Sequence, residues 1–148
     1  MNKTVRSARS RSDAPPSVLW RVLRTAHELE ARLETALAQI GLSLAKVGVL
    51  RALAEAEEPL TLSDVAERVR CVRSNITQLV DRLEADGLVR RVNDPHDRRI
   101  RRASLTPTGR SSCTEGIRVM AIQERETASA LSPVDAVALA RALGHLAP

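Results

Sequence analysis

The sequence predicts a mainly α-helical fold with one small β unit. Apolar residues recur at helical spacing along most of the 148 residues, and only residues 88–105 read as two short strands around a loop. A chain of this length has the size of one domain and can bury a core. Residues 1–14 differ, because they are basic and rich in serine without an apolar pattern, so we expect a disordered arm there.

A long first helix is expected up to residue 40, with an apolar stripe that begins at Leu19 and a stop at Gly41. Ser43 should cap a second helix, which Pro59 breaks.

Two more helices are expected after the strands. Thr106 with Pro107 has the pattern of a helix start. The segment 132–135 repeats this device before a last helix over 134–146.

The centre of the chain, residues 60–87, predicts two short helices joined by a tight turn. Thr61 and Asp64 have the spacing of a reciprocal cap, in which each side chain satisfies an exposed amide. The second helix has an apolar face from Ile76 to Leu83 and should end at Gly87.

The opposite face of this second helix carries short or planar hydrogen-bonding side chains. At about 100° per residue, it collects Ser74, Thr77, Gln78, Asp81 and Arg82, with Asn75 on its flank. Side chains of these types read base edges in the major groove of DNA. An ordinary solvated helix face would also be polar, so this face alone does not distinguish DNA recognition from simple exposure to solvent, and the next segment is needed to do so.

The two predicted strands, 88–92 and 100–105, enclose an arginine-rich loop. The segment Asn-Asp-Pro at 93–95 is typical of a turn and places Arg98 and Arg99 near the tip of the loop. An arginine there can enter a narrow minor groove while its neighbours bind phosphate. Asp97 would repel phosphate, so we expect it to pair with Arg98 or Arg99 and to orient the guanidinium.

On these residues the chain resembles the MarR family of bacterial regulators. The family's wing motif, Asp-Pro-x-Asp-Arg-Arg, stands intact at 94–99, and matching segments precede it at 79–84 and follow it at 105–109. The resemblance implies a winged helix-turn-helix over 59–105, within a MarR-type domain over 15–148. It also implies that the terminal helices, 15–40 and 106–147, form a homodimer that reads a pseudo-palindromic operator in double-stranded DNA.

The implied function is sequence-specific regulation of transcription, with repression by occupation of a promoter. Major-groove contacts are expected from the recognition helix, minor-groove contacts from Arg98 and Arg99 braced by Asp97, and phosphate contacts from the flanking residues. The candidate DNA-binding residues are Thr61, Ser63, Arg73, Ser74, Asn75, Thr77, Gln78, Arg82, Asp97, Arg98, Arg99 and Arg101.

Two positions depart from the family pattern. Arg70 stands in the turn where relatives often have glycine, and Val72 stands where they often have a capping serine or threonine. Since valine has no capping oxygen, the recognition helix is expected to begin at Arg73 or Ser74 instead.

The resemblance further implies a switch operated by a small anionic or phenolic effector, bound between the dimer helices and the winged-helix lobe. The few polar or aromatic residues on the relevant helices are the candidates: Trp20, Arg24, His27 and Lys46. Packing at an interface is the alternative for Trp20, and solvation is the alternative for Arg24.

Composition agrees with a DNA partner. The formal net charge is +5, and ten of the arginines lie between Arg68 and Arg102. The chain has no Phe and no Tyr, and Trp20 is its one Trp, so recognition of single strands by base stacking is disfavoured. A basic protein that binds DNA without sequence specificity remains an alternative.

An enzyme is not expected. The sequence has no glycine-rich phosphate loop, no nucleophile elbow and no zinc-protease motif, and His27, His96 and His145 are too dispersed to suggest a metal site. We expect no cofactor.

Redox sensing through Cys71 or Cys113 is the second alternative. Cys71 stands among arginines that favour a thiolate, although a buried, inert thiol is the competing interpretation. No apolar run is long enough for a bilayer, and no signal-peptide pattern follows the basic start, so a cytoplasmic location is expected.

Overall fold

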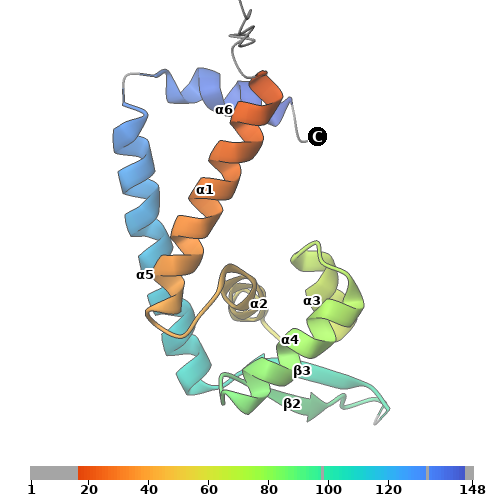
Figure 1. The fold of residues 1–148 in the computed structure, drawn as a ribbon. Helices are drawn as coiled ribbons and strands as arrows, with labels where there is room; N and C mark the ends of the chain where they lie inside the picture. The colour runs from red at the N-terminus through yellow and green to blue at the C-terminus, as the bar shows by residue number, and fades with distance from the viewer. Residues whose placement is uncertain (1–16, 98, 133, 146–148) are drawn as a thin grey trace, which may run out of the picture. The chain divides into compact units, whose positions relative to one another are not determined.

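The computed structural model describes residues 17–97, 99–132 and 134–145, and the expected arm over 1–14 and Arg98 lie outside them. The chain divides into two compact units, residues 1–31 and 32–148. In the first unit the described residues form most of helix α1 (Val18–Ala38). The second unit contains every other element of the described chain (Figure 1).

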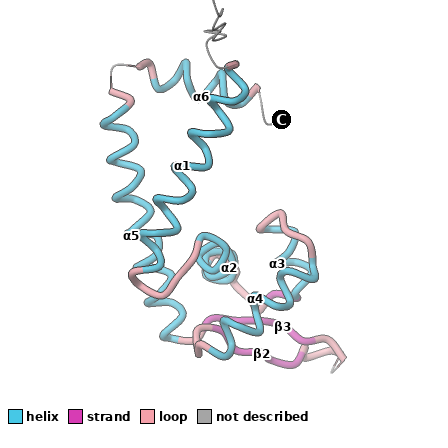
Figure 2. Tube along the Cα trace, in the orientation of Figure 1, coloured by secondary structure: helices cyan, strands magenta, loops and turns pink. Residues whose placement is uncertain are grey.

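The second unit contains five helices and three strands among its described residues, which confirms the predicted mainly α-helical class with a small β unit (Figure 2). In chain order they are α2 (Leu44–Ala54), β1 (Leu60–Thr61), α3 (Leu62–Arg68), α4 (Arg73–Ala85), β2 (Val89–Asn93), β3 (Arg101–Leu105), α5 (Pro107–Ala130) and α6 (Ala136–Gly144).

The predicted capping residues set the helix starts. The Ser43 hydroxyl accepts a hydrogen bond from the backbone N–H of Lys46 at 3.2 Å, and Thr61 and Asp64 form the complete reciprocal cap. Thr106 accepts from the N–H of Gly109 at 2.9 Å, with Pro107 in the first turn.

The last helix starts later than the sequence predicted. Asp135 is its cap and accepts from the N–H groups of Val137 and Ala138, so α6 begins at Ala136 rather than at residue 134. The carboxylate holds the first-turn amides that a helix start leaves without partners.

The strands form one antiparallel sheet in the order β1-β3-β2. Its register pairs Val89 with Leu105 and Asn93 with Arg101, and the two residues of β1 pair with the other edge of β3. We did not predict β1, because a two-residue strand carries no alternation that a sequence pattern can reveal.

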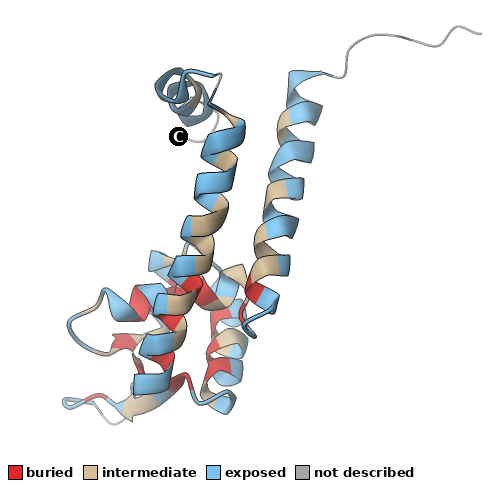
Figure 3. Ribbon diagram, turned by 90° about the vertical axis from the view of Figure 1, so that its left-hand side faces the viewer, coloured by how far each residue is buried: buried red, intermediate tan, exposed pale blue. Residues whose placement is uncertain are grey.

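The core of the second unit lies where its helices meet the sheet. Ile76, Val80 and Leu83 of α4 are fully buried, and so is Ala103 of β3. Figure 3 shows the buried residues gathered in this region, and the buried residues of α5 all lie in its first half. The apolar face predicted for α4 is therefore the face that faces the core.

The turn between α3 and α4 contains the one non-glycine residue with positive φ in the described chain. Arg70 has φ of +52°, a left-handed conformation that costs an L-residue about 1–2 kcal/mol. Val72 occupies the position before α4 and makes no side-chain cap, so the helix begins at Arg73, one of the two expected starts.

We predict that Arg70→Gly stabilises the fold, because glycine adopts this conformation without a Cβ clash. The expected gain in the free energy of unfolding is about 0.5–1 kcal/mol after the larger entropy of the unfolded glycine is subtracted. Urea unfolding at equilibrium measures it. Arg70→Ala is the matched control: it removes the same side chain but keeps Cβ, so it should give no gain. An equal gain in both variants would contradict the explanation.

Candidate nucleic-acid interface

The polar face of α4 is open to solvent. Ser74, Gln78 and Arg82 are exposed on the side opposite the buried apolar residues, and Asn75 is exposed on the flank, as the helical periodicity predicted. Thr77 is half-buried, and its hydroxyl donates to the backbone oxygen of Arg73 at 3.1 Å. Thr77 therefore retains only its acceptor lone pairs for a partner, while the exposed side chains keep their full hydrogen-bonding capacity.

A cluster of positive charge surrounds the start of α4. Arg68, Arg70 and Arg73 are exposed, and within the described residues none of their guanidinium groups has an ion pair. Three unneutralised arginines in one turn and its flanks produce a positive potential that attracts a polyanion.

The start of α3 offers one free hydroxyl out of the two predicted. The Thr61 hydroxyl accepts from the N–H of Asp64 at 3.2 Å and donates to the Asp64 carboxylate at 2.8 Å. Ser63 is exposed and makes no hydrogen bond within the described part of the chain. Ser63 is thus the more accessible of the two phosphate candidates.

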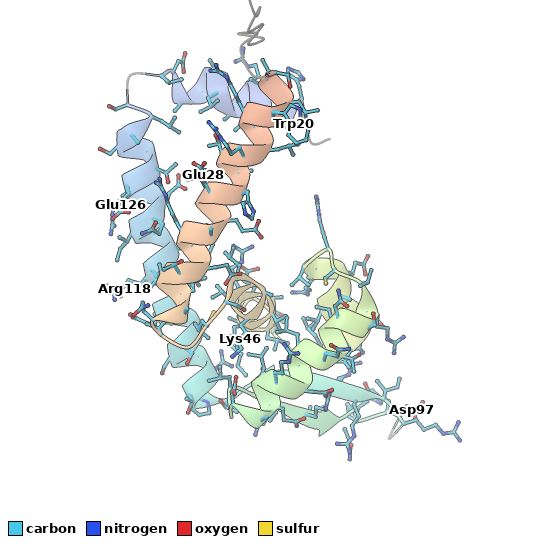
Figure 4. The ribbon with its side chains drawn as sticks, viewed as in Figure 1. Trp20, Glu28, Lys46, Asp97, Arg118 and Glu126 are labelled. Carbon is cyan, nitrogen blue, oxygen red and sulfur yellow. The ribbon has the colours of Figure 1, made fainter. Side chains whose placement is uncertain are left out.

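The wing is formed by β2, β3 and the loop between them. Asp97, Arg99 and Arg101 are exposed, and the described residues provide no ion pair for either arginine. Figure 4 shows Asp97 at the end of the wing that points away from the helices of this unit.

Asp94 organises the base of the wing loop, a role that we did not predict. Its carboxylate is buried and accepts from the N–H groups of His96 at 2.8 Å and Asp97 at 3.0 Å, and from the guanidinium of Arg102. Arg102 also donates to the backbone oxygen of Pro59 at 3.0 Å. The wing loop is therefore connected through β3 to the segment that precedes β1.

These donors stabilise the charged form of Asp94. The Arg102 hydrogen bond, followed by those of the two backbone amides, lowers the pKa of the Asp94 carboxyl to about 2. The sequence did carry a signal for this role, since an aspartate before proline often bonds to amides two and three residues later.

Asp97 has a different contact from the expected one. Its carboxylate accepts from the backbone N–H of Arg99 at 2.9 Å, rather than from an arginine side chain of the described residues. Asp97 thus shapes the backbone before Arg99 and leaves that guanidinium free. Among the described residues, the ion pair within the wing itself joins Asp94 and Arg102.

Arg91 joins the wing to α4, a role that we did not predict. Its guanidinium lies 3.0 Å from Glu84 and 2.5 Å from Asp81, both on α4. The signal was present in the strand alternation, because Arg91 shares the sheet face of buried Val89 and Ala103.

The four candidate effector residues are divided between the two units. Trp20 and Arg24 line an open depression of about 410 Å³ on the first unit, where Arg24 also pairs with Glu28, and His27 is exposed. Lys46 belongs to the second unit, and its ammonium donates to Asp86 at 2.7 Å and to the Gly41 oxygen at 3.3 Å. Lys46 therefore has a structural pairing that the sequence did not suggest.

The two cysteines differ in exposure. Cys71 is exposed in the turn before α4, and Cys113 is buried in α5. Burial and the negative charge of Glu55 raise the pKa of the Cys113 thiol, which disfavours the reactive thiolate. Redox sensing through Cys113 is therefore unfavourable.

Metal ligands do not cluster in the described part of the chain. Its residues contain no group of His, Cys, Asp and Glu side chains that could hold a metal ion. None of the described helices is long and apolar enough to cross a membrane.

We predict that Asp94→Asn lowers the melting temperature at pH 7, because asparagine keeps an acceptor for the amides but loses the ion pair with Arg102. The pKa of Asp94 falls from 3.8 to about 2 on folding, so its stabilisation is complete above pH 3.8 and is lost as the pH falls through 2. The difference between wild type and variant should shrink over this interval in thermal unfolding. Asp97→Asn is the exposed control, and a difference that stays constant down to pH 2 would refute the ion-pair explanation.

Comparison with known proteins identifies the fold and the family. A model described as the MarR family matches residues 40–100. The HTH-type transcriptional regulator PrsX of Escherichia coli is 27% identical over 114 residues, which make up 74% of this chain and 69% of PrsX.

Two solved structures extend the match beyond the helix-turn-helix. The transcriptional regulator BldR from Sulfolobus solfataricus is 31% identical, with a TM-score of 0.68 over 86% of this chain and 90% of BldR. BpsR of Bordetella bronchiseptica, whose DNA binding is regulated by 6-hydroxynicotinic acid, is 25% identical, with a TM-score of 0.76 over 88% of this chain and 93% of BpsR. The intact wing motif, the observed winged helix-turn-helix and these matches agree: the chain belongs to the MarR family of transcriptional regulators.

Proposed function

We propose that this protein represses transcription as a homodimer that binds a pseudo-palindromic site in double-stranded DNA. One observation carries the proposal: a single compact unit presents an exposed hydrogen-bonding helix face together with arginines that have no ion-pair partner among the described residues. The first feature suits base edges and the second suits phosphates. In this proposal the protein binds rather than catalyses, and it acts in the cytoplasm, where bacterial DNA lies.

The recognition helix α4 enters the major groove in this proposal. Asn75 and Gln78 have planar amides that bond an adenine edge in two places, and Arg82 can do the same to guanine. Ser74 and Thr77 offer shorter contacts. The buried apolar face supports the assignment, because it fixes which side of the helix points outward.

The wing enters the adjacent minor groove in this proposal. Arg99 is exposed and unpaired within the described chain, and the Asp97 contact shapes the backbone before it. The negative potential of a narrow minor groove attracts such a side chain. Arg73, Arg101, Ser63 and Thr61 are assigned to phosphates, and Arg98 joins Arg99 from the sequence alone.

Dimerisation supplies the symmetry that a palindrome needs. Helix α1 exposes Val18, Leu19, Trp20 and Leu23, and Trp20 retains 67% of its accessible surface. Helix α6 exposes Val137 and Leu143, and it borders an apolar depression of about 370 Å³ that it shares with α5. A second copy would cover such surfaces and place two recognition helices about 34–36 Å apart on the DNA.

Release by a small aromatic acid is the regulatory part of the proposal. The support is BpsR, which responds to 6-hydroxynicotinic acid. Arg24 and His27 are the candidate partners for a carboxylate, and Trp20 for a ring. A difference in affinity of about 1–3 kcal/mol between the two states of the dimer would change DNA occupancy by about five- to 150-fold.

Selection from a library of random duplexes tests DNA recognition and requires no assumption about the operator sequence. We expect the protein to enrich an inverted repeat whose half-sites lie about one helical turn apart. Binding of the enriched duplex should withstand an excess of unrelated duplex and should weaken with salt. Failure to enrich any sequence, with salt-sensitive binding to all duplexes alike, would favour a nonspecific basic DNA-binding protein.

Arg99→Ala tests the wing. We expect a loss of about 1–3 kcal/mol in the free energy of binding to the enriched duplex, because the minor-groove contact disappears. Fluorescence anisotropy with a labelled duplex measures it. Arg51→Ala removes an exposed arginine from α2, which lies outside both the DNA-reading elements and the terminal helices, and is the control for net charge. Equal affinities of Arg99→Ala and wild type would exclude the wing assignment.

A further inference from the structure

Arg91 lies on the side of β2 that faces the helices. It is opposite buried Ala103 in the register, two residues after buried Val89, and its side chain is only 22% exposed. Its stem is therefore held against the core at the junction of wing and recognition helix.

Two carboxylates of α4 hold the head of this side chain. Glu84 accepts from the backbone N–H of Arg91 at 3.1 Å and from its guanidinium at 3.0 Å. Asp81 accepts from the other end of the guanidinium at 2.5 Å. A planar guanidinium that bridges two carboxylates fixes the orientation of the two elements as well as the distance between them, which the single ammonium of a lysine does not do.

Asp81 needs such a partner if α4 binds DNA. It lies on the exposed face of α4, three residues after Gln78 and next to Arg82, and its side chain is 53% exposed. A carboxylate on this face would be repelled by phosphates, and the cost would grow as water left the groove. The Arg91 guanidinium neutralises the Asp81 carboxylate by an ion pair within the protein.

We propose that Arg91 is a positioning residue of the DNA interface: it bridges the wing to α4 and neutralises Asp81 and Glu84, so that the two reading elements approach DNA in one orientation. The proposal rests on the proposed function. It predicts that a side chain with little access to DNA controls the discrimination between sequences.

The neighbouring Arg90 is a matched control on the same strand. It is exposed, and its guanidinium donates to the Ser104 hydroxyl of β3 at 3.2 Å rather than to α4. Arg90→Gln and Arg91→Gln therefore remove the same charge from adjacent positions, but only the second breaks the link to the recognition helix.

The experiment measures the affinity of each variant for the enriched duplex and for a scrambled duplex of the same composition. Arg90→Gln should weaken both to a similar degree, because it removes only nonspecific attraction. Arg91→Gln should reduce the preference for the enriched duplex about tenfold or more. The double variant Arg91→Gln with Asp81→Asn should bind the enriched duplex more tightly than Arg91→Gln alone, because the more exposed of the two uncompensated carboxylates is gone.

The proposal is overturned if Arg91→Gln retains the preference as Arg90→Gln does, or if the double variant binds no better than Arg91→Gln. Thermal unfolding reports whether each variant folds. If Arg91→Gln does not, Arg91→Lys and Arg90→Lys replace the pair: both keep the charge, and only the lysine at 91, which cannot bridge both carboxylates, should lower the preference. A wild-type protein that prefers no duplex would instead reject the proposed function.

Discussion

The winged helix-turn-helix depends on the burial of one face of α4. Ile76, Val80 and Leu83 are fully buried, and together they contribute several kcal/mol of hydrophobic stabilisation, at about 1.5–3 kcal/mol for each buried side chain. Rotation of the helix about its axis would expose these side chains. The core thus decides which side chains can meet a groove, and the polar face is exposed as a consequence.

A second constraint is how charge is divided within this unit. Four carboxylates near the interface have ion-pair partners within the unit: Asp94 with Arg102, Asp81 and Glu84 with Arg91, and Asp86 with Lys46. Exposed arginines in the α3–α4 turn, on α4 and on the wing have no ion pair among the described residues, and a few arginines on the other helices share this property. Internal pairing therefore does more than stabilise the fold, because it removes negative charge from the surface that a polyanion would approach.

The sequence predicted the elements whose signals are local. The caps at Ser43, Thr61 and Thr106 were found because capping uses residues three apart, and the faces of α4 follow from helical periodicity alone. Strand β1 was not predicted from the sequence, since its two residues form a strand only through their pairing with β3. The roles of Asp94 and Arg91 were not predicted either. Each role depends on an ion pair with a side chain from another element, which the tertiary structure brings close. The pairing predicted for Asp97 is not observed with the Arg99 side chain, and its other predicted partner, Arg98, lies outside the described residues. The motif also does not show that Asp94 is the carboxylate that turns inward.

Helices α1 and α6 contribute little to the core that stabilises the winged helix. Within the described chain, α6 contributes no buried residue and α1 contributes only Leu37, near its end, while the core is otherwise built from residues 42–113. Apart from Leu37, the apolar residues of α1 and α6 are therefore not among the buried residues of this core, and their exposed side chains remain available for a partner. A change in how such helices pack would alter the orientation of the DNA-binding unit without unfolding it. Rigid-body rotation of that unit is thus the simplest way for an effector to act, because it leaves the internal charge pairs and the buried face of α4 intact.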